Sequence, residues 1–166
     1  MLKKSLPALV VGALMSSAVA AEIPIVGTVE SKCVITTDTQ GVYGNPTPSK
    51  LTTNMSDGGV PPIVRYDVIQ ADYYKALITI PEAFTESPAL GDVVNWVGDV
   101  TVAEVSDATM SAYDNDKRLY SNVTEIDLTI AGSTWFKVAS TANYGYDKAF
   151  PAGQYRATVQ AECIAI

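Results

Sequence analysis

The stretch QYRATVQAEC, residues 154–163, decides the fold class of this chain. Apolar and polar residues alternate along its whole length, so it has one apolar face and one polar face. The apolar face carries Tyr155, Ala157, Val159, Ala161 and Cys163. Because successive side chains of a β-strand point to opposite faces, the pattern predicts a half-buried strand.

The same alternation recurs along the rest of the chain. Residues 25–35 form an apolar phase that again includes a cysteine, Cys33. Further strands are predicted at 63–69, 75–80, 93–97, 100–105, 123–130 and 135–139. Turn residues rich in Gly and Pro separate most of them, and seven or eight short strands at this spacing predict an antiparallel β-sandwich. Residues 40–62 are predicted to form a long surface loop.

The first twenty residues have the composition of a secretory signal peptide. Lys3 and Lys4 precede an apolar run at 6–15, and Ala18 and Ala20 form an A-x-A cleavage signature. Cleavage after Ala20 leaves a single domain of residues 21–166. The apolar run is shorter than the roughly 20 residues of a membrane-spanning helix, so no transmembrane anchor is expected unless the signal stays uncleaved.

Charge and composition exclude several classes of function. Removing the signal leaves nine basic residues against eighteen acidic ones, a net charge of about −9. The basic residues are scattered, so nucleic acid is not an expected partner. The chain has no histidine, which excludes Ser/His/Asp and Cys/His catalysis and removes the commonest zinc ligand. Paired carboxylates remain open, but none stands out by spacing, and we expect no enzyme, cofactor or metal site.

Two cysteines, Cys33 and Cys163, are the only ones in the chain. An even number in an exported protein predicts one disulfide, and both thiols lie in the apolar phase of their strands. They face the same interior if the two strands are neighbours. Free thiols or an intermolecular bond remain the alternative, because spacing alone does not bring the Cα atoms together.

Two other patterns are weak. Residues 114–125 begin like a calcium-binding loop, but Arg118 and Leu119 occupy the positions where the EF-hand pattern needs an oxygen ligand and a glycine, so a polar turn is predicted. Several aromatic residues are candidates for a sugar-binding face, although core packing and cross-strand pairs are the favoured interpretation. These residues are Tyr73, Tyr74, Trp96, Trp135 and Tyr144.

Both terminal strands resemble a known family. The stretch GTVESKC, residues 27–33, resembles the G-x-V-x-x-x-C opening of subunits of bacterial chaperone-usher pili. The stretch PAGQYRATV, residues 151–159, is similar to the A-G-x-Y-x-x-x-V entry into their last strand. The two motifs stand at opposite ends of an exported chain with an all-β pattern.

The resemblance implies an immunoglobulin-like sandwich that lacks its final strand. A groove between the first and last strands would take the N-terminal extension of a neighbouring subunit, which is donor-strand complementation. Gly27, Val29, Tyr155 and Val159 would frame this subunit contact. Implied partners are copies of itself or related pilins, a periplasmic chaperone and an outer-membrane usher. The implied location is a cell-surface fimbrium, with a role in adhesion. First and last strands that lie side by side would place the Cα atoms of Cys33 and Cys163 about 4.5–5.5 Å apart.

The chain departs from this family in two places. Cleavage after Ala20 leaves six residues ahead of Gly27, fewer than pilins normally use as a donor. The family's disulfide usually joins the first and second strands, whereas here Cys33 has only Cys163 as a partner. These departures keep open an alternative, a self-contained exported β-sandwich that binds a carbohydrate or another ligand at its loops.

Overall fold

The structure is a computed structural model that describes residues 24–26, 33–146 and 148–166. The chain divides into two units, residues 1–30 and 31–166. In the first unit, residues 24–26 have no regular secondary structure. The second unit contains the folded domain.

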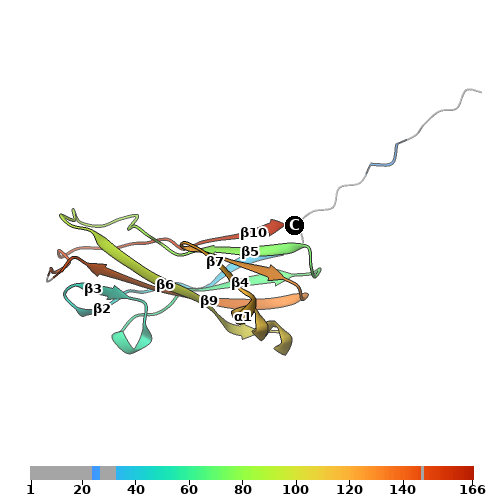
Figure 1. Ribbon diagram of the computed structural model, residues 1–166, viewed down its shortest axis with the longest axis horizontal. Coiled ribbons are helices and arrows are strands. Elements are labelled where there is room, and N and C mark those ends of the chain that lie inside the picture. The colour runs from blue at the N-terminus through green and yellow to red at the C-terminus, as the bar shows by residue number, and fades with distance from the viewer. Residues whose placement is uncertain (1–23, 27–32, 147) are drawn as a thin grey trace, which may run out of the picture. The chain divides into compact units, whose positions relative to one another are not determined.

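Ten strands, all paired antiparallel, form two sheets within the described part of this domain (Figure 1). In the first sheet, β1 (Cys33–Thr39) pairs with β4 (Ile63–Val68), and β4 pairs with the first half of β9 (Gly132–Tyr144). The second half of β9 pairs with β3 (Lys50–Thr52), which pairs with β2 (Gly44–Thr47). β6 (Val94–Val105) also pairs with β9. The second sheet has the order β10 (Gln160–Ala165), β5 (Tyr74–Thr79), β8 (Val123–Leu128), β7 (Arg118–Tyr120).

The core lies between the sheets and is built by the predicted period-two alternation. In β4, β5, β8 and β9 every second residue is buried. Tyr66 of β4 and Phe136 of β9 are both fully buried, and their rings meet edge to face with centroids 5.7 Å apart. The antiparallel β-sandwich predicted from the sequence is therefore confirmed.

Two details differ from the sequence-based expectation. Residues 40–62 are not one long loop, because β2 and β3 form there and β3 extends the sheet along the second half of β9. The strands predicted at 93–97 and 100–105 are one continuous strand, β6, through Gly98. A Cβ at Gly98 would lie 2.5 Å from the Ile80 side chain and 2.6 Å from the carbonyl oxygen of Ala139, so this glycine permits close packing and does not end the strand.

Three short helices lie in the connections: η1 (Met55–Asp57), η2 (Ala108–Ala112) and α1 (Tyr113–Asp116). Among the described residues, no helix has the length and hydropathy needed to cross a membrane. We call the side of the sandwich bounded by β6 and β7 the closed side, because η2 and α1 connect these strands across it. The opposite side, bounded by β1 and β10, we call the open side.

The segment that contains η2 and α1 covers part of the free edge of β6, at Val100 and Val102. The backbone N–H of Val102 donates to the Asp114 carboxylate at 2.8 Å, and the Lys117 ammonium donates to the carbonyl oxygen of Val100. Tyr113 is buried beside Phe136, and its hydroxyl accepts a hydrogen bond from the backbone N–H of Ile130 at 3.1 Å. Side chains thus satisfy backbone groups that an edge strand leaves exposed for pairing.

Candidate functional site

A disulfide between Cys33 and Cys163 stands at one end of the open side. The predicted bond is therefore confirmed, but the predicted pairing of the two strands is wrong. β1 pairs with β4 and β10 pairs with β5, so the bond connects the edges of two different sheets. The Cα atoms are 6.4 Å apart, which a disulfide accepts and which exceeds the spacing of directly paired residues.

Beyond the disulfide the two edges separate and leave a groove of about 1020 Å³. One wall extends from Ile35 in β1 to Tyr43, and the other extends from Gly153 to Ala161 ahead of and into β10. Between the walls, Val64, Val138 and Leu51 contribute to the lining. The lining begins two residues from each cysteine, so the groove starts directly beside the disulfide.

Both walls carry strand edges without a strand partner in the described part of the chain. β1 is the last strand of its sheet, and β10 is the last strand of the other. An unpaired edge presents a row of N–H and C=O groups that can accept a further strand. In contrast to the edge of β6, no helix of the described residues covers these two edges.

The strand predicted at 154–163 is shorter in the structure, because residues 153–159 of the groove wall form no strand. The alternation is present, with Tyr155, Ala157 and Val159 half-buried and the residues between them exposed. The strand nevertheless begins only at Gln160, which pairs with Thr79. Continuing the register would place residue 158 opposite Pro81, and proline has no N–H to donate. The segment therefore keeps the strand pattern without a ladder.

Arg156 is the one point where this wall is held by the backbone of a neighbouring segment. Its N–H donates to the carbonyl oxygen of Glu86 at 2.8 Å, and its carbonyl oxygen accepts from the N–H of Thr85 at 2.7 Å. The apolar phase of the wall thus stays turned towards the groove although residues 157–159 belong to no strand.

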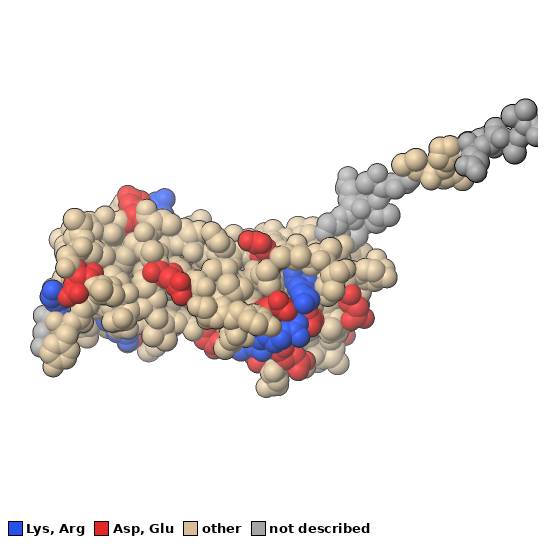
Figure 2. Space-filling model, turned by 45° about the horizontal axis from the view of Figure 1, so that its top comes forward, with Lys and Arg blue, Asp and Glu red and all other residues tan. Residues whose placement is uncertain are grey.

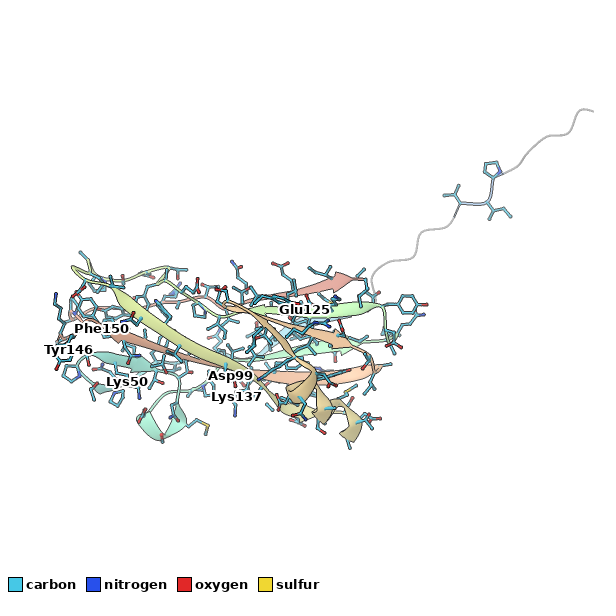
Figure 3. All side chains as sticks on the ribbon, in the orientation of Figure 1. Lys50, Asp99, Glu125, Lys137, Tyr146 and Phe150 are labelled. Carbon is cyan, nitrogen blue, oxygen red and sulfur yellow. A yellow bond between two sulfur atoms is a disulfide. The ribbon has the colours of Figure 1, made fainter. Side chains whose placement is uncertain are left out.

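An aromatic cluster marks the end of the groove away from the disulfide. Its central member is Phe84, whose ring contacts the rings of Tyr43, Trp96, Phe150 and Tyr155 at centroid distances of 4.7–6.3 Å. Phe150 also stacks on Tyr144 at 5.0 Å. Figure 3 shows Phe150 at the end of the sandwich opposite to the carboxyl end of β10. The cluster fixes both walls at that end, since Tyr43 and Tyr155 belong to opposite walls.

Three polar residues of the groove lining, Tyr43, Thr53 and Ser140, are bonded to one another. The hydroxyls of Tyr43 and Ser140 lie 3.0 Å apart, and the Thr53 hydroxyl accepts from the backbone N–H of Ser140 at 2.9 Å. Burial raises the pKa of the Tyr43 hydroxyl, although its bond to Ser140 opposes this. The groove therefore offers two kinds of contact, apolar surface between the walls and free backbone groups at the edges.

The other predicted residues fall in different places. Tyr155 and Val159 line the groove. Gly27 and Val29, and the cleavage residues Ala18 and Ala20, lie outside the described residues. Phe84 was not singled out from the sequence. It stands alone in a loop without alternation, so only the tertiary structure brings its ring to the groove.

The aromatic residues considered for a sugar-binding face do not share one surface. Tyr74 and Tyr144 are buried, and Trp96 packs on Phe84. Trp135 lies under the Arg65 guanidinium at 4.8 Å, and only Tyr73 has more than half of its surface exposed. They therefore pack at separate positions, most of them in the core or in the aromatic cluster.

On the face shown in Figure 2, basic side chains lie beside acidic ones and most of the surface is uncharged. On the second sheet, Lys75 and Arg118 both pair with Glu125, at 3.1 and 2.8 Å. The described residues contain no group of three or more side chains suited to hold a metal ion.

No protein-family model, curated protein or solved structure matches the chain. The groove of the open side is therefore the feature from which we infer a function.

Proposed function

We propose that this protein is a structural subunit of a cell-surface fimbria or pilus, assembled by donor-strand complementation and contributing to adhesion. The observation that carries the proposal is the groove of the open side, bounded by two unpaired edges. Two sheets that leave such a groove between their edges resemble a β-sandwich that lacks one strand. A strand supplied by a neighbouring subunit would complete it, and a periplasmic chaperone and an outer-membrane usher would handle the incomplete subunit beforehand.

The lining of the groove favours an extended polypeptide as its occupant. Ile35, Ile63 and Val159 line the groove and are only half-buried, so they offer apolar surface for alternate side chains of a strand. The free edges of β1 and β10 offer backbone hydrogen bonds of the kind that a small ligand does not satisfy in series. An uncovered edge of this kind promotes aggregation in water, so it needs an occupant in the functional state.

The disulfide and the predicted signal peptide support an oxidising compartment outside the cytoplasm. Structural disulfides persist in the periplasm and on cell surfaces and are rare in the cytosol. Cys33–Cys163 links the two sheets of the domain, and the proposal assigns this bond to the exported, folded subunit.

Filling the groove from within tests the proposal. Ala157 is a small residue of the groove wall, so Ala157→Trp places an indole where a donor strand would lie. Val34 is the matched control, because it is exposed on β1 and does not line the groove. Strains expressing each variant are compared by electron microscopy of surface filaments and by denaturant-resistant ladders.

We expect Val34→Trp to assemble and Ala157→Trp to accumulate as folded monomer, verified by circular dichroism. Filaments that persist with Ala157→Trp would contradict the role of the groove. A wild-type chain that stays a soluble monomer at rising concentration on size exclusion, without a chaperone, would instead support a self-contained ligand-binding sandwich.

A further inference from the structure

The two ends of the groove are closed by contacts of different strength. At one end the Cys33–Cys163 disulfide joins the walls covalently. At the other end, Tyr43 and Tyr155 of opposite walls both contact the ring of Phe84, at centroid distances of 6.3 and 5.1 Å. Aromatic contacts are far weaker than a covalent bond, so the second end is the one that thermal motion can open.

Phe84 lies in residues 81–93, which we call the strap. The strap connects β5 to β6 and contains no helix or strand, apart from an isolated bridge between Glu86 and Arg156. Two of its residues, Pro81 and Glu86, line the groove. The strap therefore borders the groove without belonging to either sheet.

The strap is bonded to the groove wall that precedes β10. The N–H of Arg156 donates to the carbonyl oxygen of Glu86 at 2.8 Å, and the N–H of Glu86 donates to the carbonyl oxygen of Arg156 at 3.2 Å. Pro88 packs directly on Gly153, where a Cβ would lie 2.5 Å from the proline ring. These contacts join the strap and residues 151–156 into one unit, which we call the flap.

The contact between the flap and the opposite wall is of a different kind. Among the described residues, no hydrogen bond or ion pair joins the flap to residues 35–43. Tyr43 meets Phe84 through its ring, while its hydroxyl lies 3.0 Å from that of Ser140 in β9. Phe84 thus connects the flap to the opposite wall through packing alone.

Hydrogen bonds fix the points where the flap begins and ends. Directly before the strap, the N–H of Ile80 donates to the carbonyl oxygen of Asn122 at 2.9 Å, and the Asn122 amide donates back to that of Ile80 at 3.0 Å. Near the other end, the N–H of Gly91 donates to the Tyr144 hydroxyl at 3.0 Å. Residues 157–159 connect the flap to β10 and belong to no strand. Loop residues beside such fixed points are where hinges generally lie.

We propose that the flap opens and closes the groove at this end, and that Phe84 is the latch that holds it against Tyr43. Local opening occurs most readily in segments that lie outside the hydrogen-bonded ladders, and the flap is such a segment. Its movement changes the distance between the walls without breaking the hydrogen bonds inside the flap. The inference goes beyond the proposed function, because the flap controls access for any occupant, strand or ligand.

The distance between the two walls tests this inference directly. Spin labels are attached through ketone-bearing unnatural amino acids at Gln40 and Gln154, which are exposed residues of opposite walls, so the native disulfide stays intact. Double electron–electron resonance then measures the distance in the mature chain. We expect one dominant short distance in the wild type. In Phe84→Ala a longer distance should increase its population by at least about threefold.

Two control variants separate the latch from a general loss of packing. Phe150→Ala removes another ring of the cluster, which contacts Phe84 and Tyr155 at 6.0 and 5.2 Å, both of them in the flap. Tyr43→Phe keeps the ring and loses only the hydroxyl beside Ser140. Both should keep the short distance dominant. Opening in either control that equals the opening in Phe84→Ala would overturn the role of Phe84 as the latch.

A second substitution covers the case in which Phe84→Ala does not fold, as judged by circular dichroism. Tyr43→Leu removes the same ring contact from the opposite wall and should give the same longer distance. A short distance that persists in every folded variant would overturn the flap and leave the proposed function intact.

Amide hydrogen exchange, measured by NMR, tests whether the flap moves as one unit. The N–H of Arg156 is bonded to Glu86 inside the flap, so in Phe84→Ala it should exchange no more than about threefold faster than in the wild type. Much faster exchange at Arg156 would show that the strap separates from the wall, and it would overturn the flap as a single unit.

Discussion

The two sides of the sandwich differ in how their unpaired strand edges are covered. On the closed side, the edge of β6 is covered by residues of the same chain, with Asp114 and Lys117 bonded to its backbone. On the open side, a disulfide joins the edges of β1 and β10 at one end, the aromatic cluster links the two walls at the other end, and a groove remains between them. Under the proposed function, the open side is the place where a strand from outside the domain pairs with these edges.

The largest effect is expected from removing the clip of the open side. Cys33→Ser with Cys163→Ser frees a loop closed over a sequence separation of 130 residues, which in the loop-entropy account costs roughly 5 kcal/mol of unfolding free energy. The thermal midpoint, measured by circular dichroism, should fall by about 10 °C or more. A midpoint unchanged by substitution and by reductant would show that the two sheets are held together without the bond.

On the closed side, we expect the free energy of unfolding to depend on the packing of buried side chains. Tyr113→Ala removes a buried ring that lies beside Phe136, and we expect a loss of about 3–5 kcal/mol in chemical denaturation. Tyr120 is the control, because it is more than half exposed on β7, and its replacement by alanine should cost less than about 0.5 kcal/mol. Equal losses in the two variants would contradict the assignment of Tyr113 to the core.

One side chain, the Asp114 carboxylate, bonds to the backbone N–H of Val102 at the edge of β6, so a single substitution removes this contact. Asp114→Ala leaves the N–H of Val102 without its partner, which should cost about 1–2 kcal/mol and expose the edge for intermolecular pairing. Asp116, an exposed residue of the same short helix, serves as the control. Sedimentation velocity should show new association only for Asp114→Ala, and association that increases equally in both variants would point to charge and not to the edge.

The smallest effect concerns a tyrosine that bonds across the core between the sheets near the open side. The Tyr66 hydroxyl donates to the carbonyl oxygens of Leu77 and Glu162 at 3.3 and 3.2 Å, and burial raises its pKa far above the ordinary value of 10.0. Below pH 10 the hydroxyl is neutral in both states. As the pH rises above 10, the unfolded chain ionises first, so the free energy of unfolding should fall.

Tyr66→Phe should cost about 1 kcal/mol at neutral pH and flatten this alkaline loss. Tyr73→Phe is the control, because Tyr73 is exposed. Denaturant titrations between pH 8 and 11 measure both quantities, and an alkaline slope that is identical in wild type and Tyr66→Phe would assign the loss to another group.

The sequence predicted the parts of this structure that depend on local alternation. The burial of Tyr155, Ala157 and Val159 follows the period-two pattern, and the apolar phase of Cys33 and Cys163 led to the correct disulfide. The length of the last strand could not be predicted from this alternation, because a strand also needs a hydrogen-bonding partner. Pro81 has no N–H to donate to residue 158, which would lie opposite it in a continued ladder. Alternation reports which way side chains face, and it does not report whether a ladder forms.

The groove itself could not be predicted from the residues that line it. Its walls come from β1 and from residues 153–161, more than one hundred positions apart, and Phe84 reaches it from a loop. The pilin resemblance placed a groove between the first and last strands, but it gave no reason for one end to be closed. That feature depends on which sheets the two cysteines belong to, which is a tertiary property.

The separation of 130 residues between Cys33 and Cys163 also has a consequence in time. Cys33 is synthesised early, and nearly the whole domain follows before its partner Cys163 is made. Contacts this distant in sequence form late and slowly. The Cys33 thiol therefore stays unpaired while the rest of the domain is made. The disulfide forms only after every strand between the two cysteines has been synthesised, so its formation marks a complete domain.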